Sequence, residues 1–187
     1  MNSFKYSCSI SEVKGSILEF GVFKGDSLRN MMNEKLNKGR KVFGFDSFEG
    51  LPENWEGTVC GKGFFSTEGS IPVIEGVKFY KGWFDNTIPK YLEENKNEII
   101  STLHVDCDLY SSTKTVLYSL NEFIVPGTII CFDEWVYRKS DGKICDDHEC
   151  KCFHEWVKDC GREFEFVEYT GDKEPCAHER KIVKILK

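Results

Sequence analysis

Carboxylates stand in two pairs where apolar stretches of this sequence end. Asp106 and Asp108 follow one apolar run, and Asp133 and Glu134 follow the next. Side chains alternate along a strand, so Asp106 and Asp108 would share one face. Carboxylates that gather in one place repel one another unless a cation neutralises them, and hard oxygen ligands select Mg²⁺ or a relative such as Mn²⁺. The pattern therefore favours a metal site over carboxylates that cap helices or face water.

A glycine turn and a later aspartate indicate a nucleoside cofactor. Gly21 and Gly25 follow an apolar run that contains Glu19, and glycines let a backbone approach a ligand closely. Their G-x-x-x-G spacing differs from the G-x-G-x-x-G of dinucleotide enzymes, and a carboxylate beside it suits a ligand that carries an amino group. Asp46 is placed to accept hydrogen bonds from both hydroxyls of a ribose. The alternative interpretation of Asp46 is a helix N-cap.

Apolar runs alternate with helical stretches along most of the chain. Parallel strands covered on both faces are expected at residues 15–21, 41–46, 77–80, 99–105 and 127–133. Helices are expected at residues 27–38, 88–96, 112–123 and 148–159. The strand starts recur at the spacing of a βαβ unit. The carboxyl ends of the strands would therefore meet at one edge, where such sheets bind ligands.

The tail and two irregular segments complete the expected architecture. A period-two pattern at 163–168 and a last run at 180–187 predict an antiparallel C-terminal strand pair. The expected fold is one three-layer α/β domain over residues 1–187, doubly wound around a mostly parallel seven-stranded sheet. Residues 49–76 and 134–147 fit no element and are interpreted as lids or acceptor loops.

The composition restricts the partners. The 187 residues carry 25 basic and 31 acidic side chains, with no basic block, which argues against nucleic acid as a partner. No apolar run approaches the roughly 18 residues that a membrane span needs. The polar start resembles no secretory signal, and nine cysteines, an odd number, favour reduced thiols. We therefore expect a cytoplasmic protein that binds small molecules.

Histidines and cysteines form a second candidate metal site late in the chain. Six of them lie within 16 positions, enough for tetrahedral zinc: Cys145, His148, Cys150, Cys152, His154 and Cys160. Their spacing matches no paired C-x₂-C pattern, so an ordinary cysteine-rich segment is the favoured interpretation. His104, inside an apolar run, is interpreted as a buried residue with satisfied hydrogen bonds rather than a catalytic base.

Five stretches of the sequence occur in the same order in one protein family. They are EFGVFKGDS at 19–27, FGFDSFEGLP at 43–52, GWFDNTIP at 82–89, VDCDLYSST at 105–113 and PGTIICFDEW at 126–135. Over about residues 16–135 the chain resembles the macrocin-type class I S-adenosylmethionine (AdoMet) methyltransferases, which O-methylate sugar hydroxyls. The resemblance implies a Rossmann-like fold, AdoMet as cofactor and a sugar or glycan as acceptor.

The resemblance also implies roles for single residues. The residues implied for the methionine part of the cofactor are Glu19, Gly21 and Gly25. Those implied for the ribose are Asp46, Ser47 and Phe48. The ring implied for the adenine is Trp83 or Phe84. Asp106, Asp133 and Glu134 fall where relatives bind a divalent metal, Mg²⁺ or Mn²⁺. Asp106 is the expected catalytic base, and Asp108 would be a fourth ligand or a neighbour of the ligands.

Two other functions are left open. The D-x-D at 106–108 also matches metal-dependent glycosyltransferases, although the glycine turn would then have no assigned function. The other is an AdoMet-binding module without turnover, because only about 15 residues precede the first expected strand, whereas relatives carry helices there. Glu134 departs from the family too, which commonly has aspartate at that position. The oligomeric state is left open, with a homo-oligomer among the alternatives.

Overall fold

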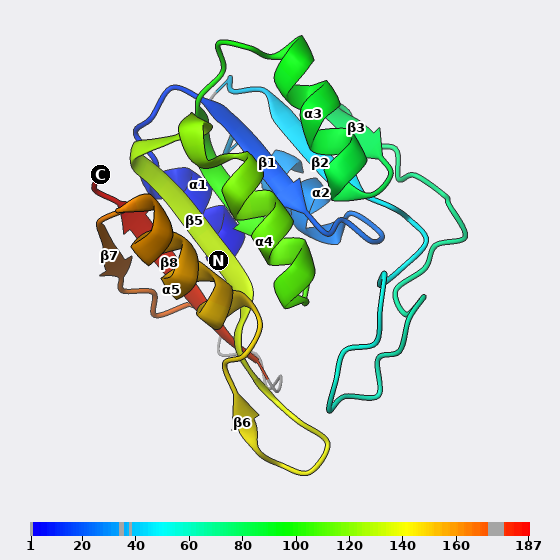
Figure 1. The fold of residues 1–187 in the computed structure, drawn as a ribbon. Helices are drawn as coiled ribbons and strands as arrows, with labels where there is room; N and C mark the ends of the chain where they lie inside the picture. The colour runs from blue at the N-terminus through cyan, green and yellow to red at the C-terminus, as the bar shows by residue number, and fades with distance from the viewer. Residues whose placement is uncertain (1, 34–35, 38, 172–177) are drawn as a thin grey trace.

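A mixed β-sheet runs through the centre of the molecule (Figure 1). The computed structural model describes residues 2–33, 36–37, 39–171 and 178–187. The strands are β1 (Ser16–Phe20), β2 (Val42–Asp46), β3 (Val77–Lys81), β4 (Ile100–Val105), β5 (Ile124–Arg138), β6 (Ile144–Cys145), β7 (Phe164–Val167) and β8 (His178–Ile185). The helices are α1 (Ser3–Ile10), α2 (Asp26–Asn33), α3 (Phe84–Glu94), α4 (Tyr110–Ser119), the 3₁₀ helix η1 (Asn121–Phe123) and α5 (Glu149–Cys160).

The strand order confirms the predicted topology. The order is β3-β2-β1-β4-β5-β8-β7, and β6 pairs with β5 outside this path. β1 to β5 pair in parallel, and β1 and β4 are buried at every position, as apolar strands between two helical layers should be. β8 lies antiparallel between β5 and β7. The described residues thus form the predicted mostly parallel sheet, to which the two-residue β6 adds an eighth strand.

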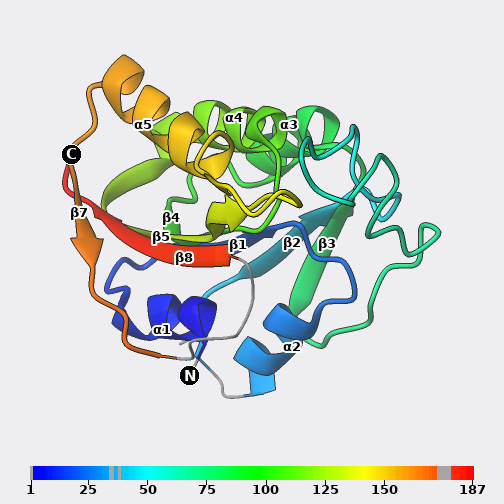
Figure 2. The ribbon, with the colours of Figure 1, turned by 90° about the horizontal axis from the view of Figure 1, so that it is seen from below.

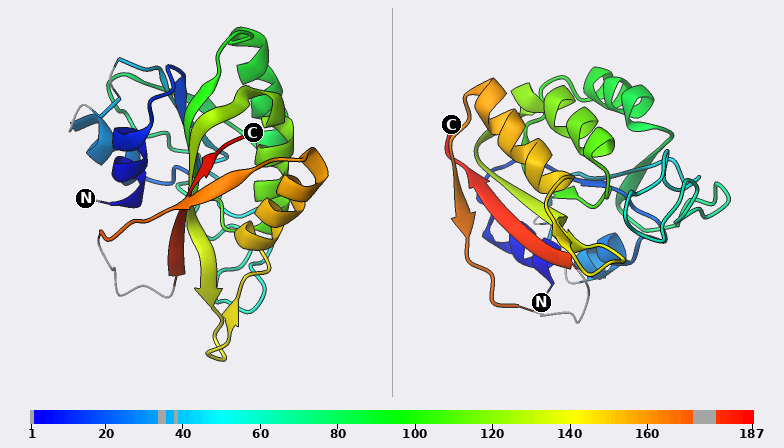
Figure 3. Two further views of the ribbon diagram at one scale, coloured as in Figure 1. Left: turned by 90° about the vertical axis from the view of Figure 1, so that its left-hand side faces the viewer. Right: turned by 60° about the horizontal axis from the view of Figure 1, so that its bottom comes forward.

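Helices cover both faces of the sheet. Figure 2 shows α3, α4 and α5 on one face and α1 and α2 on the other, and the side view in Figure 3 separates the same layers. The larger core cluster packs against α3, α4 and α5 and includes Leu103, Phe132 and Phe153. A smaller cluster under α1 and α2 includes Phe4 and Leu28. The described helices are all too short or too polar to cross a membrane.

The segment ahead of β1 folds into a helix that the sequence analysis did not predict. Asn2 caps α1, because its side chain accepts a hydrogen bond from the Lys5 amide at 2.8 Å. Phe4 is buried and its ring lies flat on the His104 ring, with 4.4 Å between the centroids. This short helix therefore contributes directly to the packing around β4.

Two predicted boundaries were wrong. β5 continues to Arg138 and turns back through β6, so residues 134–147 form a hairpin rather than an irregular segment. α3 begins at Phe84 and not near residue 88, because the amides of Asn86 and Thr87 already bond to the Trp83 carbonyl, each at 3.0 Å. Pro89 then lies inside the helix.

Other boundaries agree more closely with the sequence analysis. Residues 49–76 are irregular, as predicted. The helix predicted at 27–38 is present as α2, whereas residues 34, 35 and 38 of that prediction lie outside the described residues. Asp26 is the first helical residue of α2, and its carboxylate pairs with Arg29 at 2.8 Å.

Candidate functional site

One cleft opens at the carboxyl ends of the parallel strands. Its volume is about 580 Å³, within the range of small-molecule sites. The sequence analysis singled out eight residues of its wall: Gly21, Asp46, Ser47, Trp83, Phe84, Asp106, Asp108 and Glu134. The cleft therefore brings the side chains predicted for a cofactor and those predicted for a metal into one space.

Gly21 lets the turn after β1 press against the end of β4. Its φ is +90°, and a Cβ at this position would lie 1.6 Å from the Asp106 carbonyl oxygen. Gly25 has φ +79°, and a Cβ there would meet the side chains of Ile74 and Pro72 in the irregular segment. Both glycines thus allow other parts of the protein to pack closely against the turn after β1. Gly25 does not line the cleft.

Asp46, at the end of β2, holds the turn after β1 with its carboxylate. Oδ2 accepts hydrogen bonds from the amides of Val22 and Phe23, both at 2.8 Å, and Oδ1 accepts one from Phe48 at 2.6 Å. Oδ2 therefore uses both of its lone pairs, whereas Oδ1 keeps one. Asp46 can accept a further hydrogen bond from a ligand in the cleft through Oδ1 while it orders the turn.

Two residues predicted for the cofactor lie inside the protein instead of on the cleft wall. Phe48 is fully buried and packs edge-to-face on Phe79, in the core beneath α1 and α2. Glu19 is fully buried as well, and its Oε1 contacts the Ser27 hydroxyl and His104 Nδ1, the latter at 2.8 Å. These buried contacts hold both side chains away from the cleft.

Three carboxylates predicted to bind a metal come together. Asp106, Asp133 and Glu134 each offer an oxygen, and these oxygens all lie within 4.8 Å of one another. Asp106 and Glu134 line the cleft, whereas Asp133 lies beside them and does not line it. Asp108, with φ +62°, also lines the cleft and is buried. A non-glycine residue in this conformation is uncommon, and such strain is often found at functional sites.

The electrostatics of this cluster are those of crowded, buried acids. Burial, followed by the charge of Asp133, raises the pKa of Asp106 well above its usual value. Burial and the charge of Asp108 raise the pKa of Glu134 in the same way, and burial with Asp133 raises the pKa of Asp108 to about 7. The ionised forms of these side chains are therefore costly unless a cation shares the site.

Asp133 is the exception within the cluster. Burial alone would raise the pKa of Asp133, but His104 and Arg180 hold it well below its usual value. Arg180 donates to Oδ1 from Nε at 2.5 Å and to Oδ2 from a terminal nitrogen at 3.1 Å. Asp133 thus remains an anion, held by the guanidinium of Arg180 on β8 and by His104 on β4.

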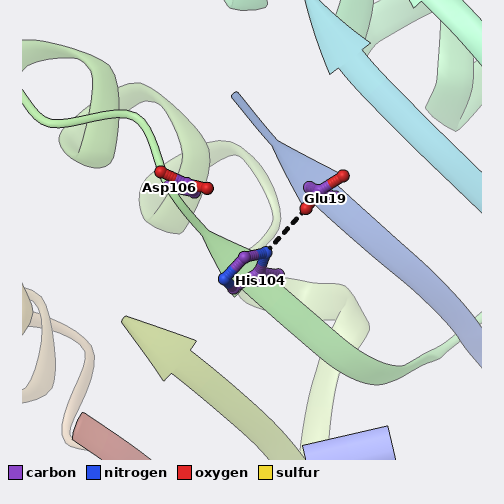
Figure 4. A group of neighbouring side chains, drawn as sticks. All are labelled: Glu19, His104 and Asp106. Carbon is purple, nitrogen blue, oxygen red and sulfur yellow. Dashed lines mark hydrogen bonds and ion pairs between the residues drawn. The ribbon is translucent and has the colours of Figure 1, made fainter. Parts of the chain in front are cut away.

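His104 links Glu19 of β1 to the carboxylates. Figure 4 shows His104 on β4 between Glu19 of β1 and Asp106 at the end of its own strand. Nε2 of His104 is 3.7 Å from Asp133, beyond hydrogen-bond range. Burial lowers the pKa of His104, but contacts with Asp133, Cys131 and Glu19 raise it well above the ordinary value. His104 is buried as predicted, but the prediction of satisfied hydrogen bonds was wrong, because its Nε2 has no hydrogen-bond partner among the described residues. The neighbours named above favour its charged form.

The carboxylate cluster fits a divalent cation. Oε2 of Glu134 is buried and has no hydrogen-bond partner among the described residues, and an unpaired buried oxygen of this kind is costly. Three carboxylate oxygens, one from the end of β4 and two from within β5, make a hard donor set of the type that binds Mg²⁺ or Mn²⁺. Neither of the two groups of candidate ligands found in the described chain includes a cysteine of the segment from 145 to 160.

Two side chains of the site were missed by the sequence analysis. Arg180 comes from β8, and Glu149, fully buried, is the first residue of α5. Oε2 of Glu149 accepts a hydrogen bond from the Glu134 amide at 3.0 Å. No local signal marks either residue, because each meets its partner only through tertiary packing.

The chain is similar to proteins that methylate sugars. The sequence model of the macrocin-O-methyltransferase (TylF) family matches residues 73–151. The 8-demethyl-8-(2,3-dimethoxy-alpha-L-rhamnosyl)-tetracenomycin-C 4'-O-methyltransferase of Streptomyces olivaceus is 26% identical over 146 residues, which cover 66% of this chain and 54% of that protein. The chain thus spans about half the length of this relative. These matches confirm the predicted resemblance to the macrocin-type O-methyltransferases.

Solved structures show the same fold. The calicheamicin methyltransferase CalS11 matches 96% of this chain and 75% of its own, with a TM-score of 0.70 and 23% identity. The O-methyltransferase NovP matches 98% of this chain and 78% of its own, with a TM-score of 0.68 and 19% identity. The chain therefore has the Rossmann-like fold of class I methyltransferases, as predicted.

Proposed function

We propose that this protein is an AdoMet-dependent O-methyltransferase that uses a divalent cation and acts on a hydroxyl of a sugar or glycoconjugate. The observation that carries the proposal is the shared cleft, with Gly21 and Asp46 on one side and Asp106 and Glu134 on the other. The similar proteins support the acceptor class, because one acts on a rhamnosyl group and another structure is described as a TDP-rhamnose 3'-O-methyltransferase. A further structure with this fold, MycE, is a complex with Mg and SAH.

The cofactor would lie along the turn after β1. Asp46 would accept a hydrogen bond from a ribose hydroxyl with the lone pair of Oδ1 that the backbone leaves, and Ser47 lies beside it on the cleft wall. Trp83 is 38% exposed at the cleft, whereas Phe84 packs edge-to-face on Phe20. Trp83 is therefore the ring available to stack on adenine.

The carboxylates would serve the acceptor. When bound, AdoMet carries the methyl group on a sulfonium sulfur, and a divalent cation lowers the pKa of a hydroxyl that it contacts. Asp106, Asp133 and Glu134 would hold the cation, and Asp106, which faces the cleft, would also take the hydroxyl proton. Because methyl transfer is an in-line displacement, much of the rate would come from positioning the two reactants.

The acceptor and the setting of the reaction belong to the same proposal. The acceptor would be a small molecule or glycan held by residues 49–76 and the hairpin at 134–147, which adjoin each other beside the cleft. The amide of Ser140 in the hairpin donates to the Gly57 carbonyl in the irregular segment at 2.8 Å. The nine cysteines support action in the reducing cytoplasm.

Asp106→Asn provides the test of the proposed chemistry. We expect this change to lower the Mg²⁺-dependent rate of methyl transfer to a sugar acceptor by about 100-fold or more, because it removes a ligand and the base. The affinity for S-adenosylhomocysteine, measured by calorimetry, should stay close to the wild-type value. Asp159→Asn, at an exposed carboxylate of α5, is the matched control.

Each alternative function predicts a different result. Absence of S-adenosylhomocysteine binding would rule out a methyltransferase, and a thermal shift with UDP-sugars plus Mn²⁺ in its place would favour a glycosyltransferase. Cofactor binding without methylation of any acceptor, with metal present, would indicate an inactive binding module. If activity survives both EDTA and Asp106→Asn, the metal-assisted mechanism is wrong.

A further inference from the structure

Asp133 and Glu134 are neighbours on β5, yet their carboxylates reach the same cluster. Successive side chains of a regular strand point to opposite faces of the sheet. The ladder between β5 and β8 is broken between Phe132 and Val136, and this irregularity contains both acids. Such bulges re-aim side chains and are common beside active sites. The shared direction of Asp133 and Glu134 therefore depends on whatever holds the bulge in place.

Arg180 holds the first of these two acids. Its neighbours Glu179 and Lys181 pair with Val136 and Phe132, so Arg180 lies directly across from the bulge. Its guanidinium donates to both oxygens of Asp133, at 2.5 and 3.1 Å, and the side chains are 23% and 15% exposed, respectively. A bidentate fork of this kind fixes the plane of the carboxylate. One lone pair on each oxygen is left, so Asp133 can still contact a cation while its carboxylate plane is held.

Glu149 holds the second acid through its backbone. The amide of Glu134 donates to Glu149 Oε2 at 3.0 Å, in the part of β5 where the ladder to β8 is interrupted. Glu149 is fully buried, and its position at the start of α5 ties the bulge to the helical layer. Arg180 and Glu149 thus hold the bulge from opposite sides, one from the sheet and one from a helix.

We infer that Arg180 and Glu149 are positioning residues that set the geometry of the cation site formed by Asp106, Asp133 and Glu134. The inference rests on the metal site of the proposed function and adds two residues that touch neither substrate nor cation. Arg180 holds the Asp133 carboxylate in one orientation. Glu149 keeps the Glu134 backbone turned so that its carboxylate joins the cluster.

Whether removal of Arg180 weakens or strengthens cation binding distinguishes a positioning role from simple charge balance. If Arg180 acted only as a nearby positive charge, its removal would strengthen cation binding, because a repulsive charge would be gone. If it positions Asp133, its removal weakens cation binding, and residues that orient metal ligands typically matter by about 10- to 100-fold in affinity. Lysine in its place would keep the charge and lose the fork.

Calorimetry of Mn²⁺ binding to the full chain without cofactor tests the inference. We expect Arg180→Gln and Arg180→Lys both to raise the dissociation constant by about 10-fold or more. Glu149→Leu should weaken binding similarly, whereas Glu149→Gln, which keeps an acceptor oxygen for the Glu134 amide, should stay near the wild type. Lys184→Gln, an exposed charge on the same strand, is the control. Circular dichroism of each metal-free variant confirms that the titrated protein is folded.

The outcomes are distinct. Tighter Mn²⁺ binding by Arg180→Gln, or wild-type binding by Arg180→Lys, would overturn the assignment of Arg180. Equal losses in Glu149→Gln and Glu149→Leu would overturn that of Glu149, because they would show that its charge and not its acceptor oxygen matters. If Arg180→Gln does not fold, Arg180→Lys decides the first question. A wild-type chain that binds no Mn²⁺ would overturn the proposed metal site and this inference together, whereas the other outcomes leave the metal site intact.

Discussion

Gly21 illustrates how a single residue joins the two halves of the site. The turn after β1 carries Val22 and Phe23, whose amides bond to Asp46, and it also passes against the backbone of Asp106. The absence of a side chain at Gly21 is what permits the second contact. One position thus sets the distance between the residues proposed for the cofactor and those proposed for the cation.

Gly21→Ala should therefore lower the free energy of unfolding by far more than the unfavourable backbone conformation of alanine alone would. Gly142 provides the comparison, because its φ is +84° and a Cβ there would meet no atom within 4 Å beyond its chain neighbours. Alanine at Gly142 should lower the free energy of unfolding by about 1–2 kcal/mol. Alanine at Gly21 should lower it by roughly 3 kcal/mol more, because the Asp106 backbone must move. Urea unfolding followed by fluorescence measures both, and equal losses would contradict the proposed contact.

At the scale of elements, the irregular segment is fastened to the hairpin and to α5. Trp55 is buried and packs on the rings of Tyr137 and His148, with centroid distances of 5.1 and 6.2 Å. Nδ1 of His148 accepts a hydrogen bond from the amide of Tyr110, the first residue of α4, at 2.9 Å. Four segments therefore meet at His148, beside the mouth of the cleft.

This junction should loosen in acid. Burial lowers the pKa of His148 below its ordinary value, against the attraction of Asp147, and the other charged groups near the ring are Lys139, Glu53 and Lys151. The unfolded chain takes up a proton below about pH 6.5, and the folded chain does so only at lower pH. Stability from His148 is therefore present above about pH 6.5 and is lost as the pH falls through its folded pKa. Protonation also removes the acceptor for the Tyr110 amide.

His148→Gln tests this linkage. The fall in melting temperature between about pH 7.5 and about pH 5 should be smaller in His148→Gln than in the wild type, because the group that titrates is gone. His154→Gln, at an exposed position of the same helix, should retain the wild-type pH dependence. Parallel curves for the wild type and His148→Gln would show that His148 does not contribute.

At the scale of the whole molecule, the cleft is built from parts that lie far apart in the chain. The wall of the cleft comes from the turn after β1, the end of β2, the start of α3, the end of β4 and Glu134 within β5. A ligand that touches all of them binds the folded chain and has no comparable site on the unfolded one. Ligand binding should therefore be visible as global stabilisation.

S-adenosylhomocysteine should raise the melting temperature by an amount that follows from its affinity. At about 100 times the dissociation constant, the stabilisation is about 2.7 kcal/mol, or roughly 5–10 °C for a chain of this size. Asp46→Ala should lose most of this shift, and Glu165→Ala, at an exposed position of β7, should keep it. A full shift in Asp46→Ala would contradict the proposed ribose contact.

The sequence alone determined a mostly parallel sheet with an antiparallel C-terminal pair, the cleft at the carboxyl ends of the strands and the acids that face it. These follow from local signals: apolar runs that must be buried on both faces, and polar residues that must come where each run ends. Asp46, Asp106 and Glu134 were found in this way. Tertiary structure alone decided that Glu19 and Phe48 turn inward, that a helix precedes β1 and that β5 carries a bulge. The hydrogen bonds of Arg180 join residues 47 positions apart in the chain. Contacts of that kind depend on which side chains the packing brings together, and the spacing of residues in the sequence does not predict them.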